Sequence, residues 1–97
     1  MNNTTAFETT DFIQYMSLDV IDELRELEEH IDNKDAKNIR KQFNHCNSLL
    51  TGIRYTLEYI EDKDTRAELQ RAVDNMKELL ESRHSTCKKI LEESGLI

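Results

Sequence analysis

The sequence contains no proline and only two glycines, Gly52 and Gly95. Because both residue types interrupt helices, their scarcity in a chain rich in Leu, Glu, Lys and Arg favours long helices. No apolar run approaches the roughly 18 residues that a membrane-spanning helix needs. The first ten residues lack the basic and apolar segments of a signal peptide. These absences predict an all-α protein that is cytoplasmic and does not enter a membrane.

Motifs that carry catalytic or cofactor chemistry are also missing. The sequence has no glycine-rich phosphate loop, no Gly-x-Ser-x-Gly nucleophile turn, and no Cys-x-x-Cys or His-x-x-x-His spacing for a metal. Its many carboxylates fall on helix faces that we expect to be solvated, where they suit solubility rather than acid–base catalysis. We therefore predict a non-enzymatic protein without a catalytic residue, metal or cofactor.

Positive charge is scarce. The chain has 13 basic residues against 20 acidic ones, which gives a formal net charge of −7. A protein that binds nucleic acid presents a cationic face to the phosphates, so this balance argues against direct nucleic-acid binding. The length of 97 residues suits one domain with a modest core. We expect a single helical domain over residues 9–97, preceded by a flexible tail over residues 1–8.

The apolar residues recur at steps of three and four, as on one face of a helix. This spacing predicts three helices, at about residues 10–31, 35–62 and 65–94. In the second helix the steps form an unbroken heptad pattern, as in coiled coils. The short polar turns between helices imply neighbours that run in opposite directions. The predicted fold is an all-α, antiparallel three-helix bundle built on a long coiled-coil-like helical hairpin.

The apolar stripes define the predicted core. In the first helix the stripe comprises Ile13, Met16, Val20, Leu24, Leu27 and Ile31. In the second it comprises Ala36, Ile39, Phe43, Cys46, Leu50, Ile53, Leu57 and Ile60. In the third it comprises Leu69, Val73, Met76, Leu80, Arg83, Cys87 and Ile90.

Polar residues and glycines mark the expected helix ends. Asp35 is the expected N-cap of the second helix, and Asp64 or Thr65 that of the third. Gly95 fits a left-handed C-cap at the end of the third helix. Gly52 lies inside the second helix at a cost of about 1 kcal/mol relative to alanine. Its position suggests that another helix passes close to the backbone there.

The cysteines and histidines suggest chemistry but have a simpler interpretation. Cys46 and Cys87 fall on the predicted stripes, where free thiols pack as small apolar residues. Across the hairpin they are out of register by on the order of 7 Å along the axis, which argues against a disulfide. His45 and His84 come near one another in the same arrangement, so a zinc or copper site is an alternative. Because the adjacent His45 and Cys46 point about 100° apart, we expect instead that both histidines are polar residues at the edge of the apolar seam.

The segment 44–58 contains the run NHCNSLLTGI followed by Leu57 and Glu58, which resembles the phosphoacceptor helix of sensor histidine kinases. The resemblance implies a helical hairpin that dimerises into a four-helix bundle, with a phosphotransfer-like or kinase-dimerisation-like role. Aligned on the Leu-Leu-Thr-Gly-Ile run, the acceptor position falls on Asn44, and His45 follows one residue later. His45 is the possible phosphoacceptor under this alternative.

The first predicted helix is strongly acidic, since Arg25 is the one Lys or Arg among residues 8–32. Several of its acids recur at steps of three and four, which places their side chains about 5 Å apart along one side of the helix. The same helix carries more apolar residues than a three-helix core needs. We expect a partner-binding surface made of Asp19, Asp22, Glu23, Glu26, Glu29, Phe12, Tyr15 and Leu18.

Such a surface suits a cationic partner, because a row of carboxylates can take the place of phosphates on a nucleic-acid-binding protein. We expect a small regulatory inhibitor or adaptor, of the type carried by phages and mobile elements. Its partner would be another protein, such as a basic nucleic-acid-binding protein or enzyme. Two alternatives stay open: the acids serve solubility alone, or the heptads pair between two copies in a structural homodimer.

Overall fold

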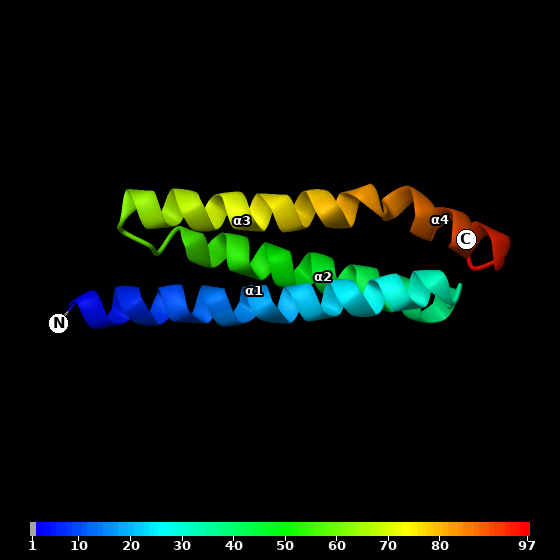
Figure 1. Cartoon of the computed structure of the whole chain (residues 1–97), viewed down its shortest axis with the longest axis horizontal. Helices are drawn as coiled ribbons and strands as arrows, with labels where there is room; N and C mark the ends of the chain where they lie inside the picture. Colours follow the sequence, from blue (N-terminus) through cyan, green and yellow to red (C-terminus); the bar gives the residue numbers. More distant parts are fainter. Residues whose placement is uncertain (1) are drawn as a thin grey trace.

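A computed structural model describes the backbone of residues 2–97 and the side chains from residue 11 onward. Four helices follow one another along the chain (Figure 1): α1 (Asn2–Asp32), α2 (Ala36–Leu57), α3 (Lys63–Ser82) and α4 (His84–Glu93). Residues 2–97 contain no strand, so the predicted all-α class is confirmed. Within this part of the chain, no helix combines the length and the apolarity needed to cross a membrane.

The helices lie side by side in a rod 55 Å long and 18 by 16 Å across. The chain runs along the rod in α1, returns in α2, and runs in the first direction again through α3 and α4 (Figure 1). The central helix is α2, which packs most extensively against α1 and also contacts α3 and α4. Contacts between α1 and α3 are sparse. The side on which α1 faces α3 is therefore the open side of the rod.

The turn between α1 and α2 forms at the predicted place. Lys34 adopts a left-handed backbone with φ of 52°, which reverses the chain. Asp35 then caps α2 as predicted: its Oδ1 accepts from the Asn38 N–H at 3.5 Å, and its Oδ2 accepts from the Asn38 side-chain amide at 2.6 Å. These bonds satisfy an amide at the start of α2 that has no partner within the helix.

The turn between α2 and α3 differs from the prediction. The second helix ends at Leu57 instead of about residue 62, and α3 begins at Lys63. Its N-cap is Asp62, whose Oδ2 accepts from the Thr65 N–H at 3.2 Å, so Asp64 and Thr65 were the wrong candidates. Ile60 is 2% exposed although it lies in the turn. An apolar residue can thus continue a helical pattern by reaching the core from a loop.

The predicted third helix is divided at Arg83 into α3 and α4. There the backbone tightens, since the Arg83 N–H donates to the Leu80 carbonyl, three residues back, at 3.1 Å. The break falls at the one charged residue of the predicted stripe, whose guanidinium is drawn to Glu28 of α1 instead of packing in the core. The single charged residue in this apolar stripe therefore marks the position at which the predicted helix is interrupted.

The start of α1 also differs, since the backbone is helical from Asn2 and not from about residue 10. Apolar spacing locates a helix only where apolar residues recur, and the predicted stripe begins at Ile13, so the spacing does not fix where the helix starts. Met1 and the side chains of residues 2–10 lie outside the described part of the chain. The flexibility of residues 1–8 stays a prediction.

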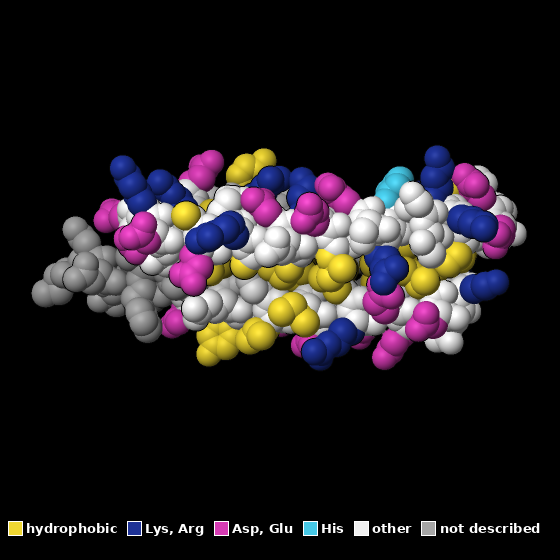
Figure 2. All heavy atoms as spheres, turned by 45° about the horizontal axis from the view of Figure 1, so that its top comes forward, with side chains coloured by type: hydrophobic (Ala, Val, Ile, Leu, Met, Phe, Trp, Pro, Cys, Tyr) yellow, Lys and Arg dark blue, Asp and Glu magenta, His cyan; other side chains and the backbone are white. Residues whose placement is uncertain are grey.

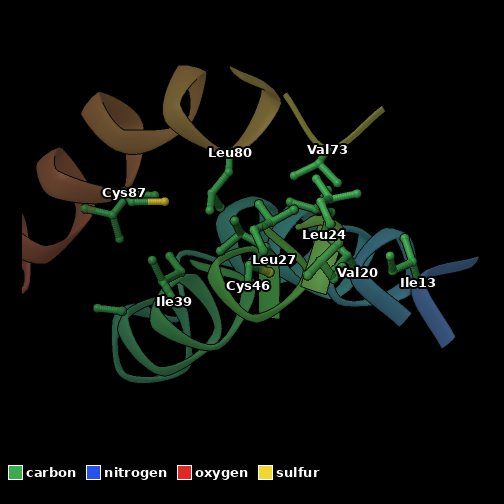
Figure 3. Packing of buried hydrophobic residues seen from close by; sticks show 14 of the residues in the cluster. Ile13, Val20, Leu24, Leu27, Ile39, Cys46, Val73, Leu80 and Cys87 are labelled. Atoms are coloured by element: carbon green, nitrogen blue, oxygen red, sulfur yellow. The ribbon is translucent and has the colours of Figure 1, made fainter. Parts of the chain in front are cut away.

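The core is a strip of apolar side chains between the helices (Figure 3). Every buried side chain among residues 11–97 belongs to a predicted stripe, and none is polar or charged. They are Ile13, Val20, Leu24, Leu27, Ala36, Ile39, Cys46, Leu50, Ile53, Leu57, Ile60, Val73, Leu80, Cys87 and Ile90. The predicted close approach at Gly52 is wrong, because no atom of another described segment lies within 4 Å of the position that a Cβ would take there.

Candidate protein-binding surface

The outer side of α1, away from the core, carries most of the acids that the sequence singles out. Asp19, Asp22, Glu26 and Glu29 are exposed and share this side of the helix; we call them the acidic row. Asp22 lies 3.7 Å from the guanidinium of Arg25, and both side chains are exposed. The other three carboxylates form no ion pair within residues 11–97. The row is therefore a band of largely uncompensated negative charge.

Glu23 has a different position, on the side of α1 that faces α2. The Gln42 side-chain amide of α2 donates to the backbone carbonyl oxygen of Glu23 at 2.9 Å and also to its carboxylate. The Nε2 of His45 lies 3.9 Å from the same carboxylate. Glu23 thus links α1 to α2, and the structure does not bring it into the acidic row.

Apolar side chains continue the outer surface of α1 toward its N-terminus. Phe12 is 50% exposed, Tyr15 70% and Leu18 60%. Tyr15 precedes Asp19 by four residues, so the apolar and acidic parts follow one another along the same helix face. This face offers a partner both apolar area and negative charge.

Beside this face, α1 and α3 enclose a shallow groove of about 200 Å³, which we call the apolar groove. Its apolar lining comes from Ile21 and Leu24 of α1 and from Met76 and Leu79 of α3. Figure 2 shows hydrophobic side chains in the seam between the helices and on the surface beside it. Leu79 is half exposed and is missing from the predicted surface. Its signal in the sequence is the pair Leu79–Leu80, of which only the second residue fits the stripe.

The two histidines have different neighbours. His45 is about half exposed and lies near Glu23 of α1. His84 sets its ring edge-on against Phe43, with 5.7 Å between the ring centroids. Within residues 11–97, no group of three or more His, Cys, Asp or Glu side chains is placed to hold a metal ion. A phosphoacceptor role for His45 stays a prediction.

Both cysteines are buried and free. Burial raises the pKa of the Cys46 thiol to about 11, with a smaller contribution from the Glu23 carboxylate. Burial also raises the pKa of Cys87. Because the thiolate is the form that attacks electrophiles and binds metals, these surroundings favour a packing role for both side chains.

The acidic row lies on the outer side of α1, and the apolar groove lies beside it, between α1 and α3. Comparison of the whole sequence and structure with protein-family models, with curated proteins and with solved structures gives no match.

Proposed function

We propose that this protein acts without catalysis, as a small regulatory inhibitor or adaptor that binds a cationic protein through the outer side of α1. The partner would be a basic nucleic-acid-binding protein or enzyme, and the setting would be the cytoplasm. One observation carries the proposal: Asp19, Glu26 and Glu29, whose carboxylates form no ion pair within residues 11–97, share a helix face with the exposed side chains of Tyr15 and Leu18.

Each half of this surface has a physical role in binding. Apolar side chains clustered on a surface mark interaction sites more often than scattered ones do, because burying them against a partner is favourable. Carboxylates without local counter-charges produce a negative potential that attracts cations and aligns them before contact. A partner with basic residues beside an apolar patch could contact the apolar side chains and the acidic row at the same time.

The fold supports such a role if it is an antiparallel three-helix bundle on a coiled-coil-like hairpin, as we also propose. The continuous stripe from Ala36 to Leu57 in α2 and the alternating helix directions in Figure 1 favour this interpretation. Packing of α1 against α2 would hold the acidic row on a rigid helix, so that the partner meets a preformed surface.

The test uses two variants with the same change in charge. Asp19→Asn/Glu26→Gln/Glu29→Gln removes three charges from the row, and Glu68→Gln/Glu78→Gln/Glu92→Gln removes three exposed charges from α3 and α4. Each protein is immobilised, and the retained host proteins are identified by mass spectrometry. We expect a basic protein to be retained by the wild type and the α3/α4 variant but lost from the row variant. It should also elute from the wild type when the salt is raised from about 0.15 M to about 0.5 M.

Equal retention by all three proteins would exclude the acidic row as the binding site. The apolar groove also favours a second candidate, the structural homodimer, because a second copy could cover it. The mass in solution separates the two: a dimer that the substitution Leu79→Ser dissociates would support self-association, whereas a monomer would leave the groove to the partner.

A further inference from the structure

A second concave surface lies between α2 and α4, built from other helices than the apolar groove. It is a pocket of about 400 Å³. Its apolar lining comes from Ile39 and Phe43 of α2 and from Cys87 and Leu91 of α4. Figure 3 shows Ile39 and Cys87 at the same end of the core, on facing helices. The volume falls within the range of small-molecule sites in proteins.

Two irregular features of the backbone build this pocket. Because the helix is interrupted at Arg83, α4 is a separate helix from α3, and it packs against α2. At the other end of α4, Gly95 adopts φ of 80°, and the Leu96 N–H donates to the Leu91 carbonyl at 3.0 Å. This left-handed cap, which the sequence predicts, turns the chain back and places Ile97 at the edge of the pocket.

The charges around this pocket are opposite to those of the molecule as a whole. Arg40 and Lys88 both line it, together with Asn44 and His84, and no Asp or Glu side chain does. Neither Arg40 nor Lys88 forms an ion pair within residues 11–97. The lining thus places two cations beside an apolar surface with no carboxylate among them, in a chain with 20 acidic and 13 basic residues.

We propose that this pocket binds a small amphipathic monoanion, namely an aliphatic or aromatic body that carries one carboxylate or similar group. The body would lie against Ile39, Phe43 and Leu91, and the anionic group would be held by Arg40 and Lys88. Because the lining is apolar, we expect a simple inorganic anion to bind poorly. Because the charged groups of the lining are cations, we expect a neutral or cationic lipid to bind poorly as well. This site is independent of the surface on α1, so either can exist without the other.

The probe is decanoate, compared with decanol and decyltrimethylammonium, which share its chain but differ in charge. Binding is followed by amide chemical shifts in ¹⁵N NMR spectra and by thermal unfolding. We expect decanoate to shift the amides of Ile39, Phe43 and Leu91 and to raise Tm, whereas the cationic analogue at the same concentration should do neither. Decanol should bind at least tenfold more weakly than decanoate.

Two double variants test the role of the cations. Arg40→Gln/Lys88→Gln removes the cations of the pocket, and Lys63→Gln/Arg71→Gln removes two exposed cations of α3 and so changes the net charge equally. The first variant should lose at least tenfold in affinity for decanoate, and the second should match the wild type. Equal affinity of the two variants would overturn the proposal. So would equal binding of decyltrimethylammonium, or decanoate-induced shifts centred on Ile21 and Leu79 of the apolar groove.

Discussion

The Nε of Arg83 lies 2.5 Å from Oε1 of Glu28, so the break between α3 and α4 is tied directly to α1. This Nε is buried and has no well-aligned hydrogen bond within the described residues, which leaves the Glu28 carboxylate as its compensating charge. The two side chains as a whole are about two-fifths exposed, and solvent therefore screens their attraction.

A double-mutant cycle measures this pair. Glu28→Gln and Arg83→Gln should each lower the free energy of unfolding, and their coupling should be about 0.2–1 kcal/mol, as for partly exposed ion pairs. Urea unfolding followed by circular dichroism gives the four values. The exposed pair Asp22–Arg25 is the internal comparison, with an expected coupling at the lower end of this range. Additive effects of the two substitutions would show that the contact contributes nothing to stability.

Gly52 provides a prediction of increased stability. It lies within α2 with open space where a Cβ would be. We therefore expect Gly52→Ala to stabilise the protein by about 0.5–1 kcal/mol, because alanine restricts the unfolded chain and suits a helix interior. Gly95→Ala is the contrasting variant, since its φ of 80° strains any residue with a Cβ, and it should destabilise the protein. Urea unfolding measures the change in the free energy of unfolding for each variant. A destabilised Gly52→Ala protein would indicate that another chain packs at that position.

The N-cap of α3 makes stability depend on pH. Hydrogen bonds from the Thr65 hydroxyl and N–H hold the pKa of Asp62 below its ordinary value of 3.8. Since the pKa is lower in the folded state, the carboxylate stabilises the fold above the unfolded pKa, and this contribution is lost as the pH falls through the folded pKa. We expect Asp62→Ala to lower Tm at pH 7 and the difference from the wild type to shrink below about pH 4.

Asp62→Asn is the control for this titration, because asparagine caps helices well but carries no charge. Its Tm at pH 7 should lie closer to that of the wild type than the Tm of Asp62→Ala does. Thermal unfolding followed by circular dichroism at several pH values measures all three proteins. A gap between wild type and Asp62→Ala that stays constant down to pH 3 would show that the charge of Asp62 has no role.

The buried thiols should be unreactive in the folded protein. At pH 8 a thiol with a pKa of about 11 is ionised in roughly one molecule in a thousand. We expect Cys46 and Cys87 to react with a disulfide reagent at the rate of unfolding, and both to react at once in urea. Absorbance of the released thiol measures the rate. Rapid modification of either cysteine without denaturant would mean that the helices around it open easily.

Periodicity in the sequence predicts the core well, because a helix face that is buried must repeat its apolar residues every three or four positions. Helix ends are less predictable. Asp62, Asp64 and Thr65 are all good caps within four positions, and the choice among them depends on where Leu57 and Ile60 pack. The break at Arg83 is likewise hard to predict, since Glu28, the ion-pair partner of this residue, lies on a different helix.

The candidate surface could be predicted only in part. Spacing alone places Asp19, Asp22, Glu26 and Glu29 on one side of α1, and the structure leaves all four exposed. The different position of Glu23 requires knowledge of which side of α1 meets Gln42. The pocket between α2 and α4 could not be predicted, because its lining depends on the direction of α4 after the break at Arg83 and on the position of Ile97 after the turn at Gly95.

The central position of α2 has a consequence for the rate of folding. Two of its three neighbours in space, α1 and α3, are also its neighbours in sequence, and the chain closes each of these pairs through a turn of residues 33–35 or 58–62. Short closures cost little chain entropy, and proteins dominated by such local contacts fold in microseconds to milliseconds. A newly made chain would expose its apolar stripes only briefly, which limits the time in which they can associate with other chains.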